Sequence, residues 1–362
     1  MHPYLRFELL LRRNGSAGEA SAGCGVPAPV VRRILGKALI DRFCPFGQPL
    51  CESRPGGGER PAAPRELCHL ADVCPYGVLF AASLTRRPPY AVYVPAGGGG
   101  EPGAAVDPGA GAAAADGRGG AGARLEITLY GPAWQLHAWV LASLQEALRR
   151  GVGKARQSWE VEEVTRRRPE GAPVRLAGGD LRALPAALRP DLLGLALEPY
   201  LAVREVAVEL LSPARLLRDG RLVGGAERVP FDLLIARILD RFASLYGEGA
   251  SEILRPEIRS VVEAEAASVP LLADDSSWVE VRDYSARSGA ELLLGGKVGR
   301  LVYGSQAGRF LPILRAGEIL HLGKNTASGC GRMRVTLVPE ELGAAAEAPG
   351  REIRAAGRPR GG

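Results

Sequence analysis

The sequence predicts an α+β fold made of two tandem ferredoxin-like (RRM-like) domains. Apolar residues alternate along some segments, as in strands, and recur every three to four residues along others, as in helices. These segments follow one another as strand, helix, strand, strand, helix, strand, which is the ferredoxin-like order. A similar order recurs after about residue 199, and 362 residues are enough for two hydrophobic cores.

The first domain is expected to span residues 1–198. Two segments interrupt its pattern: a cysteine-rich insertion at 42–80 and a Gly/Ala/Pro-rich stretch at 96–123. The composition of the second segment predicts a disordered loop. Strands are predicted at 5–11, 90–94, 124–130 and 157–165, and helices at 27–41 and 134–150.

The second domain is expected at 199–340, and the basic tail at 341–362 is expected to be disordered. The helix at 230–246 has the clearest apolar face, and a glycine-rich segment separates the last two predicted strands. Strands are predicted at 201–211, 278–284, 296–303, 319–322 and 333–338, and helices at 230–246 and 306–316.

Composition and charge narrow the class of protein. No run of about eighteen apolar residues occurs, so the sequence predicts no membrane span, and the N-terminus resembles a strand more than a signal peptide. A cytoplasmic location is therefore expected. The net charge of +6 is carried almost entirely by arginine, which suits a polyanionic partner. A compositional bias toward Ala, Gly and Pro explains the arginine content equally well.

The glycine-rich segment at 317–332 is the most informative motif. Three glycines, Gly323, Gly329 and Gly331, lie within nine residues between two predicted strands. Glycine permits positive φ and close approach to the main chain, so backbone amides there are able to point at phosphate oxygens. Lys324 and Arg332, with Asn325 and Thr326, add donors that position a phosphate chain. A wide hairpin with glycines at its corners accounts for the spacing equally well.

The surrounding residues resemble a known family. Residues 295–335 are similar to the C-terminal signature of the CRISPR-associated endoribonucleases that process precursor RNA, within the RAMP superfamily. The upstream segment with Tyr284, Ser285 and Arg287 also resembles that family, whereas Ser328 replaces an aromatic that is usual before the last glycines. The signature is carried by Gly295, Gly296, Pro312, Leu314, His321, Gly323, Lys324, Gly329 and Gly331.

The resemblance implies a function. It implies binding of a CRISPR repeat RNA and one cut per repeat, by metal-independent attack of the ribose 2′-hydroxyl that leaves a 2′,3′-cyclic phosphate. No cofactor is then required for cleavage, and the protein is expected as a monomer or homodimer. The alternative is a non-catalytic RNA-binding subunit of a CRISPR effector complex. Predicted RNA contacts are Arg32, Arg33, Lys37, Tyr284, Arg287, Gly323, Lys324, Asn325, Thr326, Gly329, Gly331 and Arg332.

Candidates for the chemistry are few. Such a cleavage needs a base, an acid and a cation facing the charged transition state. Of the four histidines, His321 is best placed to contact RNA, because it enters the glycine-rich segment beside Lys324. A packing role beneath the loop is the competing interpretation. Relatives often carry a catalytic histidine or tyrosine on the first helix, which here offers Lys37 as the candidate, beside Arg32 and Arg33.

Four cysteines in the insertion form a second candidate site. Cys44, Cys51, Cys68 and Cys74 have the spacing C-x6-C-x16-C-x5-C, and two of them precede similar Pro-aromatic-Gly turns. A structural zinc ion is the preferred interpretation, because four thiolates leave no open coordination position. An iron–sulfur cluster or plain reduced thiols are the alternatives.

Overall fold

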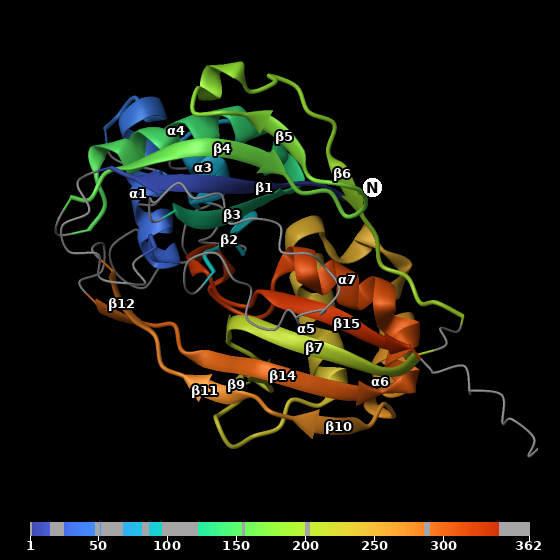
Figure 1. Ribbon diagram of the computed structural model, residues 1–362. Coiled ribbons are helices and arrows are strands. Elements are labelled where there is room, and N and C mark those ends of the chain that lie inside the picture. The colour runs from blue at the N-terminus through green and yellow to red at the C-terminus, as the bar shows by residue number, and fades with distance from the viewer. Residues whose placement is uncertain are drawn as a thin grey trace, which may run out of the picture.

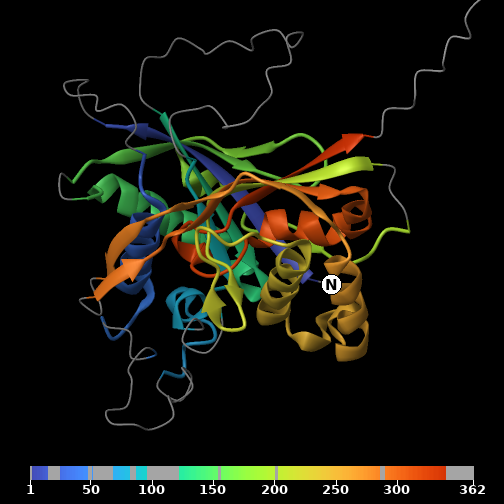
Figure 2. The same ribbon diagram turned by 90° about the horizontal axis from the view of Figure 1, so that it is seen from below.

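The computed structural model describes residues 2–14, 25–47, 51, 68–81, 87–95, 122–153, 156–199, 203–285 and 290–339. Two antiparallel sheets lie next to one another, and Figure 2 shows the helices of both gathered below the strands. The predicted low-complexity loop and the tail lie outside the described residues, apart from the two residues that begin β3. No helix in the described part is both long and apolar enough to cross a membrane.

The first sheet has the strand order β2-β3-β1-β4-β5, and β6 pairs with β1. Without β5 and β6 this is the ferredoxin-like order, and α1 and α4 pack together on one face of the sheet (Figure 1). The elements are β1 (His2–Arg13), α1 (Ala28–Phe43), α3 (Pro75–Leu79), β2 (Tyr90–Tyr93), β3 (Gly122–Tyr130), α4 (His137–Arg150), β4 (Trp159–Arg166), β5 (Val174–Ala177), η4 (Leu181–Ala183) and β6 (Asp191–Leu193).

The second sheet has the order β10-β14-β7-β15, again the ferredoxin-like arrangement. The strand β11 pairs with β14, and β12 and β13 form a separate hairpin that reaches α1 (Figure 1). The elements are β7 (Val203–Ala214), β8 (Leu217–Arg218), β9 (Arg221–Leu222), α5 (Phe231–Tyr246), α6 (Pro256–Ala267), β10 (Leu271–Asp274), β11 (Ser277–Val279), β12 (Arg282–Ser285), β13 (Ala290–Leu293), β14 (Gly296–Gly304), η7 (Ser305–Phe310), α7 (Leu311–Leu320), η8 (Thr326–Ser328) and β15 (Met333–Pro339).

The alternation in β1 explains its place at the centre of the first sheet. Leu5, Phe7 and Leu9 are fully buried on the side of the helices, while Arg6 and Glu8 point to the other face and form ion pairs. Burying each large apolar side chain contributes about 1.5–3 kcal/mol, so a one-residue slip in register would be strongly disfavoured.

Two predicted strands of the second sheet differ in the structure. The segment predicted as one strand at 278–284 is divided between β11 and β12, and β10 is the strand beside β14 that completes the fold. The strand predicted at 319–322 is wrong, because α7 continues to Leu320. Gly317 lets α7 pack closely against α5 and β15, since a Cβ there would come within 2.8 Å of Ile238 and 3.0 Å of Met333.

Candidate nucleic-acid interface

The glycine-rich loop packs against the first sheet's unit rather than standing free. Its short helix η8 contacts both α1 and β2. Gly329 has φ +94°, and a Cβ there would overlap the Cβ of Ala28 at the start of α1. Gly331 has φ +78°, and a Cβ there would overlap the carbonyl oxygen of Leu322. These two glycines are therefore needed for close contact between chain segments.

Several amides of the loop are already bonded within the protein. The amide of Lys324 donates to the carbonyl of Arg215 (3.1 Å), and the amide of Leu322 donates to that of Gly331 (2.7 Å). The amide of Gly331 in turn donates to Pro213 (3.0 Å). These bonds fix the loop to the end of β7, so its rigidity depends on the sheet behind it.

His321 lies beneath this loop and is only 2% exposed. Burial lowers its pKa well below the ordinary histidine value, and the nearby Arg332, Arg6 and Arg241 lower it further. Its Nδ1 has no hydrogen-bond partner among the described residues. The ring is therefore uncharged at neutral pH and is packed away from the surface, as the competing interpretation of the sequence had it.

Arg332 is also buried, at 8% exposure. Its Nη1 donates to the carbonyls of Glu318 (2.8 Å) and Met333 (2.7 Å), and its Nε lies 3.6 Å from the Glu126 carboxylate. Arg6 bonds the same carboxylate through its Nε at 3.0 Å. Burial acts to raise the pKa of Glu126, but Arg332 and Arg6 outweigh it and hold that pKa below its ordinary value. Arg332 thus joins the two units.

Two further arginines at this junction were missed by sequence reasoning. Arg241, fully buried on α5, donates to the carbonyls of Leu320 (3.3 Å) and Pro88 (3.2 Å), and Arg87 donates to that of Gly323 (3.4 Å). The hydroxyl of Tyr130 donates to Ile319 (2.6 Å). The signal for Arg241 was its place on the apolar face of an amphipathic helix, where a charged residue has to find partners.

Exposed cations lie on the surface above this junction. Arg33 and Lys37 project from α1, and Lys324 and Asn325 project from the loop. The Nη2 of Arg33 donates to both carboxylate oxygens of Asp283 (2.8 and 2.9 Å) and to the carbonyl of Tyr284 (3.3 Å). This pair attaches the β12–β13 hairpin to α1, and it leaves the Tyr284 side chain 58% exposed.

Some of the predicted RNA contacts are exposed in the structure and others are buried. Arg33, Lys37, Tyr284, Lys324 and Asn325 are exposed around α1, whereas Thr326 and Arg332 are buried. The guanidinium of Arg32, half-buried, lies 5.8 Å from the ring centroid of Phe80, and Arg287 lies outside the described residues. Lys37, the second catalytic candidate, forms an ion pair with Asp41 at 3.2 Å.

The cysteine-rich insertion is described only in part. Cys44 follows α1, Cys74 precedes α3, Cys51 is buried and Cys68 is half-buried. Across the part of the chain that the structure describes, no three His, Cys, Asp or Glu side chains converge to hold a metal ion. The four thiols do not form a preformed tetrahedral site, so the zinc prediction gains no support from this geometry.

Models of two known protein families match parts of the chain. A family model described as CRISPR-associated endoribonuclease Cas6 matches residues 208–333, from within β7 to the start of β15. A further family model, described as an N-terminal domain, matches residues 26–186. The resemblance predicted from the sequence is confirmed over the Cas6 match, which contains both the hairpin and the glycine-rich loop. No protein of curated function matches the chain.

Solved structures share the fold at low sequence identity. A partial Cas6-RT-Cas1–Cas2 complex aligns with a TM-score of 0.50 at 13% identity, covering 93% of this chain and 46% of that chain. A Thermus thermophilus Cas6 aligns with a TM-score of 0.46 at 13% sequence identity, covering 93% of this chain and 99% of that chain. The product of a Cas6-related gene from Pyrococcus furiosus aligns with a TM-score of 0.41 at 8% sequence identity, covering 92% of this chain and 98% of that chain. The strand orders of the two sheets and the alignment at a TM-score of 0.50 confirm the predicted α+β fold with two ferredoxin-like units.

Proposed function

We propose that this protein binds a CRISPR repeat RNA across the exposed surface of α1, the β12–β13 hairpin and the glycine-rich loop, and that it cleaves precursor CRISPR RNA there. The observation that carries the proposal is that the glycine-rich loop of the second unit packs against α1 of the first, and that both carry exposed cations, Arg33 and Lys37 on α1 and Lys324 on the loop. The family match over residues 208–333 supports the same function.

The exposed side chains suit single-stranded or looped RNA. Lys37 and Lys324 neutralise phosphates without geometric demands, and Arg33 presents a guanidinium already oriented by Asp283. Tyr284 offers an aromatic face to an unstacked base. RNA that crosses from α1 to the loop would contact both units, so binding depends on the junction beneath remaining closed.

The proposed reaction is an internal transesterification. The ribose 2′-oxygen attacks the adjacent phosphorus, the bond to the 5′-oxygen breaks, and the products end in a 2′,3′-cyclic phosphate and a 5′-hydroxyl. Lys37 is the candidate to face the charge that develops on the phosphate or to protonate the departing 5′-oxygen. We assign the buried His321 to positioning the loop rather than to contact with the reacting atoms.

A specific observation favours the alternative of a non-catalytic RNA-binding subunit, which would act within a CRISPR effector complex. Helix α1 carries no histidine or tyrosine, and the one histidine beside the loop is uncharged and buried. A site without an exposed general base is suited to holding RNA but poorly suited to activating a 2′-hydroxyl.

One assay separates these functions. Repeat RNA is incubated with wild-type protein, Lys37→Ala and the control Arg204→Ala in excess chelator. Arg204 is an exposed arginine near the start of β7, in the second sheet. A single wild-type cut ending in a cyclic phosphate, lost in Lys37→Ala and kept in Arg204→Ala, supports the nuclease. Tight binding without cleavage supports the alternative, and absence of binding at moderate salt would overturn both.

A further inference from the structure

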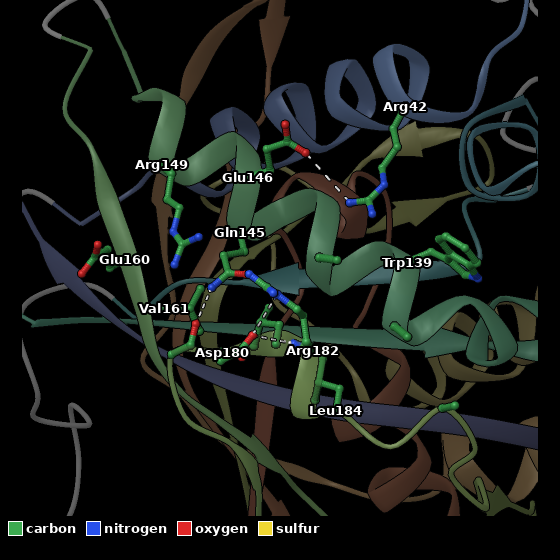
Figure 3. A pocket seen from close by; sticks show the side chains of 15 residues that line it. Arg42, Trp139, Gln145, Glu146, Arg149, Glu160, Val161, Asp180, Arg182 and Leu184 are labelled. Carbon is green, nitrogen blue, oxygen red and sulfur yellow. Dashed lines mark hydrogen bonds and ion pairs between the residues drawn. The ribbon is translucent and has the colours of Figure 1, made fainter.

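A pocket of about 820 Å³ lies on the outer face of the first unit, where α4 passes over β4 and η4. Its floor is apolar, formed by the buried side chains of Val161, Leu181 and Leu184. Figure 3 shows Trp139 at one end of the α4 face and Arg149 at the other, with Gln145 between them. The proposed RNA surface does not include any of these residues.

The side chain of Trp139 packs against Phe43 on one side and is about half exposed to solvent. Its side chain is 49% exposed, and Phe43 packs edge-on against it with a centroid distance of 5.1 Å and an interplanar angle of 85°. A tryptophan that is fixed on one side and open on another is a platform on which a planar ring stacks. Stacking on such a face is tolerant of base identity, because every base has a π-face.

Gln145 supplies an oriented polar group at the centre of the pocket. It is 8% exposed, and its Nε2 donates to the carbonyl of Gly179 at 2.7 Å. This bond fixes the amide plane, and no residue in the described part of the chain donates to its Oε1. The amide oxygen is therefore available to accept from an exocyclic amine or ring N–H of a base.

Three arginines and three carboxylates line the pocket. Each of its three carboxylates has an arginine partner: Glu146 pairs with Arg150 at 2.5 Å, Glu160 with Arg12 at 2.5 Å, and Asp180 with Arg182 at 3.6 Å. Arg149, by contrast, forms no ion pair with any residue that the structure describes. Its exposed guanidinium is therefore available to bind a phosphate.

The pocket is connected to the proposed RNA surface by a continuous chain of ion pairs. Asp41 bonds Lys37 at 3.2 Å and Arg150 at 3.3 Å, and Glu146 bridges Arg150 to Arg42 on the pocket rim. Basic residues that alternate with Asp41 and Glu146 thus connect the predicted RNA contact Lys37 to the pocket. A polyanion that follows α1 would arrive at this rim.

We infer that the pocket binds a short unpaired stretch of the RNA, outside the segment held at the junction of the two units, because Trp139 and Arg149 are separated by about 15 Å along α4. One base stacks on Trp139, the Gln145 amide oxygen accepts a hydrogen bond from a base of the same stretch, and Arg149 binds one of its phosphates. This inference rests on the proposed function, because it takes the occupant to be a continuation of the same RNA strand.

The test compares two RNAs and four proteins. One RNA is the minimal repeat segment, and the other carries single-stranded extensions on both sides. Binding of each is measured for wild type, Trp139→Ala, Trp139→Phe and the control Leu272→Ala, which removes an exposed apolar side chain on the far sheet. Circular dichroism and thermal melting confirm that the variants fold. Cross-linking of 5-iodouridine placed along the extension locates the base.

Trp139→Ala should weaken binding of the extended RNA about tenfold and leave the minimal RNA unchanged, while Trp139→Phe restores binding because a phenyl ring still stacks. Cross-links should occur at Trp139. Equal affinity of all four proteins for the extended RNA would overturn the inference, and so would cross-links elsewhere only, which would leave the pocket to a protein partner. The proposed function fails separately, if wild type binds neither RNA.

Discussion

The buried junction and the exposed surface above it use the same residue types for opposite purposes. In the junction, Arg6, Arg332 and Arg241 bond carboxylates and carbonyls that are withdrawn from water. On the surface, the exposed side chains of Arg33 and Lys37 pair with carboxylates that are partly buried. The first kind of pair, which includes the contact of Arg332 with Glu126 between the two units, forms at high desolvation cost. The second kind leaves the cation partly in solvent, where a phosphate is able to reach it.

This difference indicates that the buried residues of the glycine-rich loop determine where its exposed residues lie. The residues that face inward, His321 and Arg332, fix the position of the residues that face outward, Lys324 and Asn325. Substitutions in the junction should therefore reduce stability first and RNA binding as a consequence. Substitutions on the surface should reduce RNA binding with little change in stability.

The largest effect is expected for Glu126→Gln. It leaves Arg6 and Arg332 buried without a counter-charge, which typically costs about 3–5 kcal/mol. The matched control is Glu8→Gln, at the position opposite Glu126 in the β1–β3 register, whose pair with Arg167 is more exposed. Urea denaturation measures both free energies of unfolding. Equal losses for the two variants would contradict the distinction between buried and exposed pairs.

Gly331→Ala should lower the free energy of unfolding by less than Glu126→Gln does. The loss should still exceed that of its control, Gly171→Ala. Positive φ in a non-glycine residue costs about 1–3 kcal/mol, and the new Cβ also overlaps the Leu322 carbonyl. Gly171→Ala imposes a similar φ of +86° with nothing within 4 Å of the added Cβ. The difference between their melting temperatures measures the crowding alone. If Gly171→Ala proves the more damaging, the close packing of the loop is not what requires glycine.

The pH dependence of stability should report on His321. Its folded pKa is lowered by burial and by the neighbouring arginines, so below about pH 6.5 the unfolded chain binds a proton that the folded chain does not. Stability should therefore be full above that pH and fall as pH drops toward the folded pKa, with a limiting slope of about 1.4 kcal/mol per pH unit. The Glu126 contribution is lost only at lower pH, below about 4.5.

Removal of the imidazole isolates this contribution. His321→Asn keeps a side chain that tolerates the positive φ of 60° at this position and does not titrate. Its free energy of unfolding, measured by urea denaturation between pH 7 and pH 5, should vary less than that of wild type. Parallel curves for the two proteins would show that another group controls the pH dependence in this range.

The smallest change in stability is expected for Lys324→Ala. An exposed side chain away from caps and buried pairs usually alters the free energy of unfolding by less than about 0.5 kcal/mol. The affinity for repeat RNA should nevertheless fall several-fold, and the salt dependence of binding should become shallower by about one counterion. Filter binding over a salt series, with Arg204→Ala as the control, checks both expectations.

Much of the fold was predictable from periodicity. The helix at 230–246 and the strands at 5–11 and 124–130 were found where α5, β1 and β3 lie, because their apolar faces are continuous and one-sided. The helix α6 and the strand β10 were missed. Only Val262 and Ala266 of α6 are buried and β10 is four residues long, so neither has a strong periodic signal.

The residues of the candidate site were predictable from the sequence, but the burial of their side chains was not. The loop and its glycines were identified from sequence, as were Arg33, Tyr284 and Lys324 on the exposed surface. Which of the candidate residues would be buried was not predictable. The partner of Arg332 is Glu126, two hundred residues earlier on the other sheet, and no local pattern joins them.

The sequence by itself therefore determined the order of the elements and the family resemblance of the second unit, because periodicity and motif spacing are properties of neighbouring residues. Only the tertiary structure decided that His321 and Arg332 lie inside and Lys324 outside. Burial and the neutralisation of charge depend on which distant segments meet, and here two sheets meet across the glycine-rich loop.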